Sequence, residues 1–180
     1  MTDFDFWKKQ YQGTWDQSSE REKAIGRFLS QATDHRIVEV GLGAGASEFI
    51  SGAATQHGHM KGDADLRVEG TDIYLEVTGP LVSSVDERQD LWIRPDKILN
   101  AREKAGEHET WIVHHLPKND LIRVVPLDDA FWAAHDQGEF PIVTPRIRGV
   151  QERYRAIPAG SPYVKECSVL IARLKKVRPK

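Results

Sequence analysis

Residues 62–80 alternate apolar and polar side chains on both sides of a turn, and this pattern constrains the fold of the chain most strongly. Two such runs predict two adjacent β-strands, each with one apolar and one polar face. The turn is expected at Glu69–Asp72, where Gly70 supplies the positive φ that a two-residue hairpin loop requires. The stretch therefore predicts a β-hairpin rather than a helix or an irregular loop.

The hairpin determines which residues face each other across the two strands. With the loop at residues 70–71, Leu66 is expected opposite Leu75, and Asp65 opposite Glu76. Directly opposed side chains have Cβ atoms roughly 5 Å apart, and two like charges at that distance are unfavourable unless they share a cation or a proton. Asp65 and Glu76 therefore predict either a site for Mg²⁺ or Mn²⁺, which prefer oxygen ligands, or an exposed face whose acids point at water.

Composition excludes several classes of protein. The 180 residues are 39% hydrophobic and 29% charged, which is typical of a soluble globular protein. A net charge of −2 excludes binding of nucleic acid by bulk charge, so any such binding must use a local basic patch. The single Cys167 excludes an internal disulfide framework. We find no signal-peptide core and no apolar run of membrane-spanning length, so we expect a cytoplasmic protein that does not enter membranes.

The rest of the chain predicts one domain built around an α/β core. We expect an N-terminal helical segment at residues 1–35, a core at 36–135, and an arginine-rich loop with a closing helix at 136–180. The patterns predict helices at 3–16, 18–33, 46–58, 96–104, 127–135 and 167–177, and further strands at 36–40, 111–116 and 121–126. Residues 81–95 and 141–163 are expected to be irregular loops.

A glycine-rich turn follows the strand at 36–40. Gly41, Gly43 and Gly45 come directly after Ile37–Val40, and the stretch resembles motif I of class I S-adenosylmethionine-dependent methyltransferases. Glycines at a strand-to-helix turn allow the backbone to approach a ligand closely. The resemblance implies an acidic residue at the end of the next strand, and Asp72 is the candidate. This alternative conflicts with the hairpin, which places Asp72 beside a turn.

A second resemblance covers residues 46–125 and includes the two acidic strands. Glu48 begins a predicted helix, Ala64-Asp65-Leu66 looks like the PD element, and Leu75–Thr78 looks like the E-x-K strand of the PD-(D/E)xK nuclease superfamily. This resemblance implies a restriction-endonuclease-like fold, in which a central mixed β-sheet is flanked by helices. It also implies metal-dependent hydrolysis of phosphodiester bonds in DNA or RNA.

The resemblance assigns roles to individual residues. Asp65 and Glu76 would hold Mg²⁺ or Mn²⁺ together with the Val77 carbonyl, and Glu48 would be a further acid of the site. Thr78 stands where the family has a lysine, and threonine carries no charge to orient water or to stabilise a phosphate. Lys97, at the start of the next predicted helix, is the candidate to replace it, and Lys61 is the other nearby lysine.

Four arginines in the segment 141–163 predict either a nucleic-acid contact or solvated loop side chains that pair with local acids such as Glu152. They are interleaved with Tyr154, and arginine with an aromatic side chain suits a phosphate backbone and a stacked base. The candidates are Arg146, Arg148, Arg153 and Arg155. The resemblance favours DNA over RNA and is compatible with a homodimer. If no lysine reaches the acids, the chain would instead be a non-catalytic relative that only binds nucleic acid or protein.

Overall fold

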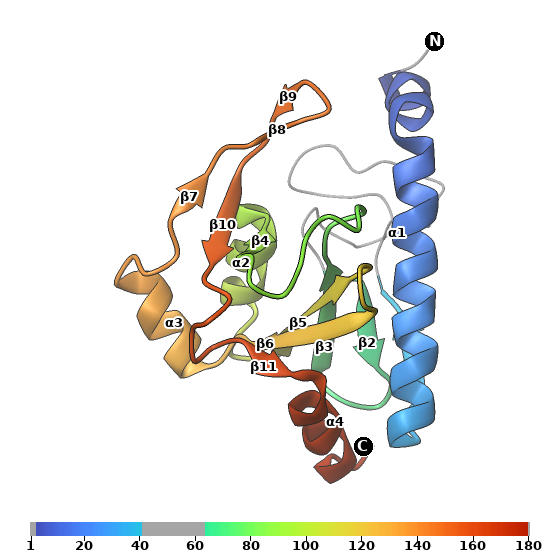
Figure 1. The fold of residues 1–180 in the computed structure, drawn as a ribbon. Coiled ribbons are helices and arrows are strands. Elements are labelled where there is room, and N and C mark those ends of the chain that lie inside the picture. Colours follow the sequence, from blue (N-terminus) through green and yellow to red (C-terminus); the bar gives the residue numbers. More distant parts are fainter. Residues whose placement is uncertain (1–2, 41–63, 180) are drawn as a thin grey trace.

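The structure, a computed structural model, describes residues 3–40 and 64–179, with side chains from residue 17 onward. A six-stranded mixed sheet with the order β1-β2-β3-β5-β6-β11 forms its centre (Figure 1). The strands of this sheet are β1 (Ile37–Glu39), β2 (Leu66–Val68), β3 (Ile73–Thr78), β5 (Glu109–Leu116), β6 (Leu121–Pro126) and β11 (Lys165–Glu166). The four helices are α1 (Asp3–Thr33), α2 (Pro95–Glu103), α3 (Asp129–Asp136) and α4 (Cys167–Lys176).

Short strands outside the central sheet form two smaller sheets. A three-stranded sheet has the order β4-β10-β7, and β8 pairs with β9 in a two-stranded hairpin. Their bounds are β4 (Leu91–Ile93), β7 (Ile142–Val143), β8 (Arg146–Ile147), β9 (Val150–Gln151) and β10 (Tyr154–Ile157). The expectation of irregular loops at 81–95 and 141–163 was therefore wrong in part, because these short strands pair with one another.

The hairpin register is confirmed. Leu66 pairs with Leu75, and Arg67 with Tyr74. Gly70 has φ +73° as expected, but the amide of Thr71 donates to the carbonyl of Val68, so the tight turn centres on residues 69–70 instead of 70–71. The turn moves by one residue without changing the register, because the Thr71 side chain also bonds the Val68 carbonyl and holds the loop closed.

The N-terminal segment is one helix where the sequence predicted two. α1 runs without a break through residues 16–19, and the buried Ser19 lies within it instead of capping a second helix. The helix ends where predicted, at Asp34, whose φ of +60° is the left-handed conformation that often terminates helices. Ile25 and Leu29, one turn apart, point at the sheet and bury the apolar stripe of the helix.

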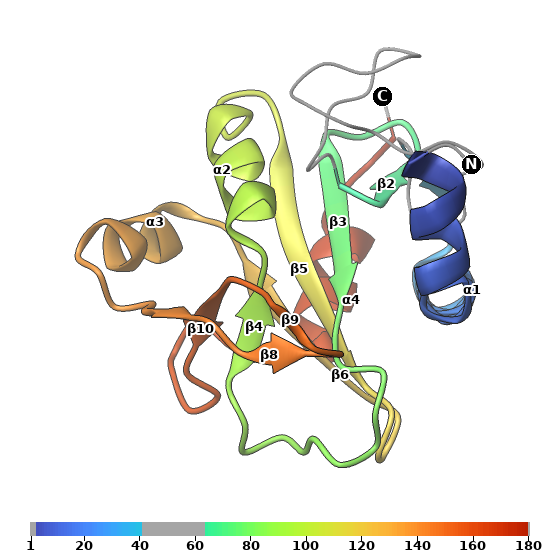
Figure 2. The ribbon, with the colours of Figure 1, turned by 90° about the horizontal axis from the view of Figure 1, so that it is seen from above.

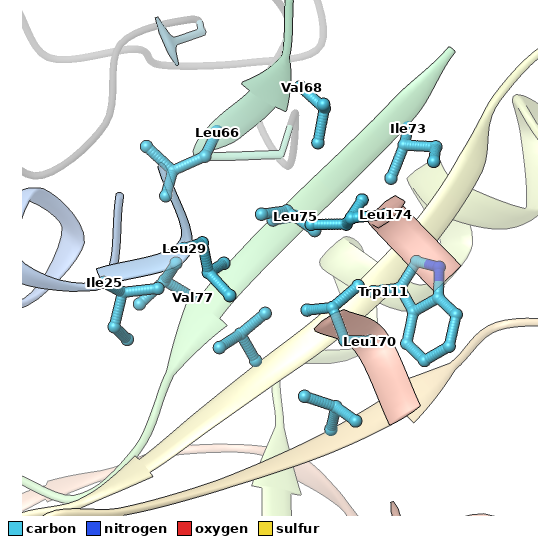
Figure 3. Packing of buried hydrophobic residues seen from close by; sticks show 12 residues of the cluster. Ile25, Leu29, Leu66, Val68, Ile73, Leu75, Val77, Trp111, Leu170 and Leu174 are labelled. Atoms are coloured by element: carbon cyan, nitrogen blue, oxygen red, sulfur yellow. The ribbon is translucent and has the colours of Figure 1, made fainter. Parts of the chain in front are cut away.

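The central sheet separates two hydrophobic cores. α1 and α4 cover one face, where Ile25, Leu29, Leu170 and Leu174 pack on Leu75 and its neighbours (Figure 3). α2, α3 and strand β4 cover the other face, around Ile98, Phe131 and Ile112. Seen from above, α2 and α3 lie on the side of the sheet opposite α1 (Figure 2).

This arrangement confirms the predicted α/β fold with a central mixed sheet flanked by helices, and it is consistent with the restriction-endonuclease-like class. β3 and β5 form a parallel pair, and α2 lies in the connection between them, whereas the other pairs of the central sheet are antiparallel. β5 is buried along most of its length, as expected for a strand covered on both faces. Within the described residues, no helix is long and apolar enough to cross a membrane.

Candidate active site

Asp65 and Glu76 lie on the face of the sheet that α2 covers. Each is about 7% exposed, so the interpretation of acids that point at water was wrong. Alternation along β3 places Leu75 and Val77 in the α1–α4 core and turns Glu76 to the opposite face. Asp65 directly precedes β2, and its amide donates to the carbonyl of Leu75 on β3. The two carboxylates therefore lie side by side on a covered face.

Lys97 reaches both carboxylates from the first turn of α2. Its Nζ lies 3.0 Å from Oε2 of Glu76 and 3.5 Å from Oδ1 of Asp65. The Lys97 side chain is only 15% exposed, so water screens the three charges poorly. α2 begins with Pro95 at its first position, directly after β4, and this fixed start places Lys97 over the sheet.

The second oxygen of the Asp65 carboxylate is held by the main chain. Oδ2 accepts a hydrogen bond of 2.9 Å from the amide of Val77. The contact that the structure describes therefore involves the N–H of Val77, whereas the sequence analysis assigned a role to its carbonyl. This bond fixes the orientation of Asp65 and directs Oδ1 toward Lys97.

Burial and charge control the protonation of this cluster. Burial raises the pKa of Glu76 well above its ordinary value, and the neighbouring Asp65 carboxylate adds to the rise, whereas Lys97 and Arg94 oppose it. Burial alone would lower the pKa of Lys97, but the carboxylates of Glu76 and Asp65 raise it overall. Lys97 is therefore firmly protonated, and the cluster holds one fixed positive charge beside two acids.

A cavity of about 230 Å³ opens beside the cluster, between α2 and the sheet. Glu76 and Lys97 line it, together with Tyr74 and His108, whose rings stack with centroids 4.0 Å apart. The remaining lining is mostly apolar, with side chains such as Ile112. A small concave space with a few charged groups is the usual form of a ligand site.

Arg94 is a residue of this region that the sequence analysis did not select. It occupies the position just before α2, three residues before Lys97, and its guanidinium binds Asp96 at 2.6 Å. Its positive charge also acts on Glu76 and Asp65. In the sequence, only its position three residues before Lys97, at the start of the predicted helix, could have indicated that Arg94 belongs to this region.

The arginine candidates of residues 141–163 separate into two groups. Arg146, Arg148 and Arg153 are exposed on or beside the β8–β9 hairpin. Arg155 is half-buried on β10 and donates to the carbonyl of Phe140 at 2.9 Å, so it holds two segments of the fold together. The structure therefore leaves the first three in a position to contact a ligand and gives Arg155 a structural contact.

Other sequence candidates find no support in the described residues. Glu48, Lys61 and the turn at Gly41–Gly45 lie outside them, as does the helix expected at 46–58. Asp72 lies in the hairpin turn between two antiparallel strands, so it does not end a strand parallel to β1 as the methyltransferase alternative requires. Thr78 lies at the end of β3, two residues after Glu76, and pairs with His114 of β5.

Comparisons with known proteins assign no family. No protein-family model matches the chain, and a search of curated proteins gives no significant match. A solved structure described as a nuclease from a fusselovirus aligns with 88% of this chain and 91% of that chain, at 15% sequence identity and a TM-score of 0.49. A likeness of this size assigns neither a family nor an activity, so the function has to be argued from the cluster itself.

Proposed function

We propose that this protein is a metal-dependent nuclease that hydrolyses phosphodiester bonds in DNA or RNA. One observation carries the proposal: Lys97, from a separate helix, places its ammonium group 3.0 Å from Glu76 and 3.5 Å from Asp65. The sequence lacks a lysine at Thr78, and Lys97 supplies the missing charge from the other side of the site. Two acids can hold a divalent ion, and a lysine beside them can stabilise the charge that develops on a phosphodiester during hydrolysis.

The donor set fits Mg²⁺ or Mn²⁺. Both ions prefer oxygen ligands, and Mg²⁺ is commonly bound through one or two carboxylates, with water and substrate phosphates at the other positions. Oδ1 of Asp65 and Oε2 of Glu76 converge on one cation, which is the Lys97 ammonium in this structure. The described residues hold no group of three acidic, histidine or cysteine side chains, so these two carboxylates are the ligands that the proposal offers to the ion.

Each residue would then have a distinct task. A divalent ion, when bound, lowers the pKa of water and offsets the charge of a phosphate. Asp65, oriented by the Val77 amide, and Glu76 would hold the ion. Lys97 would turn its ammonium toward the attacking water or toward a non-bridging phosphate oxygen, because it stays protonated at every physiological pH.

Cleavage assays with Asp65→Asn test this function. Labelled single-stranded and duplex DNA and RNA are incubated with the protein and Mn²⁺ or Mg²⁺, and products are separated on a gel. We expect cleavage by the wild type and a loss of at least a hundredfold in the variant, since the ion loses a charged ligand. Asp129→Asn, an exposed acid of α3, is the matched control and should cleave normally. Full cleavage by Asp65→Asn would refute the assignment.

Metal binding can be measured separately from cleavage. Thermal unfolding with and without Mn²⁺ should show a higher midpoint with the ion, because a ligand that binds the native state stabilises it. The shift should disappear in Glu76→Gln. A wild type that shows neither a shift nor cleavage would favour the second candidate, a non-catalytic binding protein. The direct Lys97 contacts support that candidate as well, because they can equally be a structural ion pair.

A further inference from the structure

The small sheet β4-β10-β7 has one buried face and one exposed face beside the candidate active site. Leu91 and Ile93 of β4 are buried in the core under α3, whereas Trp92 between them is 41% exposed. Since side chains alternate along a strand, Trp92 and Arg94 share the outward direction. Trp92 therefore leaves a substantial part of its ring accessible to a ligand.

Tyr154 of β10 extends this exposed face. Its ring stacks on Trp92 with centroids 5.9 Å apart and planes inclined by 25°. Ala156 pairs with Trp92, and two residues further along the same register Tyr154 comes opposite Arg94. The Tyr154 hydroxyl donates to Glu152, which fixes the ring. Trp92 and Tyr154 therefore present a pre-formed aromatic pair, which we call the Trp92 surface.

Arg94 and Arg148 lie close enough to the Trp92 surface to act electrostatically on Tyr154. Residues 141–157 contain four arginines and Glu152 as their only acid, in a chain whose net charge is −2. The β8–β9 hairpin carries Arg146 and Arg148 and projects from the body of the molecule (Figure 1). Arg148 and Gly149 both have positive φ, +51° and +79°, which is the type I′ turn that places Arg148 at the exposed tip. The local charge is thus positive and suits a polyanion.

The Trp92 surface and the acidic cluster are joined by a short, rigid connection. β4 passes directly into α2, so Trp92, Arg94 and Lys97 lie within six consecutive residues. Pro95 at the first helical position restricts the backbone between them. Arg94 acts electrostatically on Tyr154 on one side and on Glu76 on the other. A chain of nucleotides could therefore contact the Trp92 surface and the acidic cluster at the same time.

We propose that the Trp92 surface binds an unpaired base of single-stranded nucleic acid and thereby directs a single strand into the site. This inference rests on the proposed nuclease function and names its substrate class. Bases in a duplex are stacked on their neighbours, so only an unpaired base offers a free face to Trp92. Stacking on aromatic side chains with arginines along the backbone is the common way in which proteins hold single strands.

Binding assays without metal test the inference, because no cleavage can occur. Fluorescence anisotropy of a labelled single strand is measured with wild type and Trp92→Ala, in DNA and RNA arms, with a duplex of the same sequence for comparison. We expect the wild type to prefer the single strand and Trp92→Ala to bind it about tenfold more weakly, since one stacked base is commonly worth that much. Trp92→Phe should retain most of the affinity, because it keeps an aromatic face. Tighter binding of DNA or of RNA decides which strand is the ligand.

Two controls separate a local effect from a general one. Leu99→Ala removes an apolar side chain of α2 that is 58% exposed, and it should bind like the wild type. Arg146→Gln should weaken binding of single strand and duplex alike and reduce the salt dependence by about one phosphate contact. Thermal unfolding of Trp92→Ala checks that a loss of affinity is not a loss of fold.

The outcomes distinguish this inference from the proposed function. Equal single-strand affinity of Trp92→Ala and wild type, or tighter binding of duplex than of single strand, would overturn it while leaving cleavage through Asp65 intact. Conversely, a protein that never cleaves but loses single-strand affinity in Trp92→Ala would refute the nuclease and support the Trp92 surface.

Discussion

Lys97 shows how a single side chain can join residues that lie far apart in the sequence. Its ammonium reaches two acids on neighbouring strands from the first turn of a helix, although twenty or more residues separate it from either acid. The two acids could be predicted because strict alternation fixed their register. Their contact with Lys97 was only a hypothesis, since no periodic pattern specifies how a helix docks on a sheet.

Removing Lys97 should make the protein more dependent on metal. Without the ammonium group, two buried carboxylates face each other, so we expect Lys97→Met to lose about 3 kcal/mol of unfolding free energy in the absence of metal. Mn²⁺ should then stabilise the variant more than the wild type, because the ammonium no longer competes for the same oxygens. Urea unfolding with and without Mn²⁺ measures both effects.

Lys175→Met, an exposed lysine of α4, is the control for this experiment. The Mn²⁺ effect in that variant should equal the effect in the wild type. An equal or smaller Mn²⁺ effect in Lys97→Met would show that Lys97 and the ion do not share ligands. Cleavage should also be lost in Lys97→Met, since the charge beside the phosphate is gone.

His114 should make stability depend on pH. Burial lowers its pKa to about 3, with contributions from Arg123, whose Nη2 lies 3.4 Å from the ring, from Arg21, and from His115. In the unfolded chain histidine titrates near 6.5, so below that pH the unfolded state binds a proton that the folded state refuses. Stability is therefore lost as pH falls from about 6.5 toward 3.

The comparison with His114→Gln isolates this effect. Between pH 7 and pH 5 the free energy of unfolding of the wild type should fall by about 2 kcal/mol more than that of the variant. Urea unfolding at each pH measures this difference. If the free energy of unfolding depends on pH equally in the two proteins, His114 takes up its proton as readily in the folded state as in the unfolded state.

At the scale of elements, the strongly periodic segments were predictable and the short ones were not. The hairpin, β5, β6, α2 and α4 were expected within a few residues of their observed bounds, and the helix expected at 127–135 is α3, which Asp128 caps by accepting a bond from the Phe131 amide. β4 and β10 are too short to show a period, and their partners lie some sixty residues apart. Such pairings follow from tertiary packing, which local patterns do not encode.

The end of β3 contains a glycine that no other residue can replace. Gly79 has φ +139°, and a Cβ built on it would lie 2.1 Å from the carbonyl oxygen of His115 on the neighbouring strand. We expect Gly79→Ala to lower the free energy of unfolding by about 3 kcal/mol or more, since both the backbone and β5 must shift. Denaturant unfolding measures this loss.

Gly138→Ala is the matched control for this element. Gly138 also has positive φ, +79°, but a Cβ there would meet nothing within 4 Å. Gly138→Ala should lower the free energy of unfolding by about 1 kcal/mol, which is the effect of the left-handed backbone conformation alone. Equal losses in the two variants would mean that the contact with β5 is not what requires Gly79.

At the scale of the whole molecule, the central sheet separates a hydrophobic core on one face from the candidate active site on the other. One face carries the α1–α4 core, and the other carries the acidic cluster, the cavity and the surface formed by β4 and β10. The sequence indicated the fold class and the two acids. It did not indicate that the arginine segment would return to β4, and thus bring Trp92 and Tyr154 together beside the site.

The packing of α1 against α4 has a consequence for synthesis in the cell. The ring of His35, just after α1, lies 2.8 Å from the carbonyl of Leu174, 139 residues further along the chain. A ribosome adds about 5–20 residues per second, so the part of the α1 stripe that packs on α4 lacks this partner for on the order of ten seconds, whereas β1 and β3 are made sooner. During that interval the nascent chain exposes apolar side chains of α1. We expect the nascent chain to depend on chaperones until α4 has been synthesised.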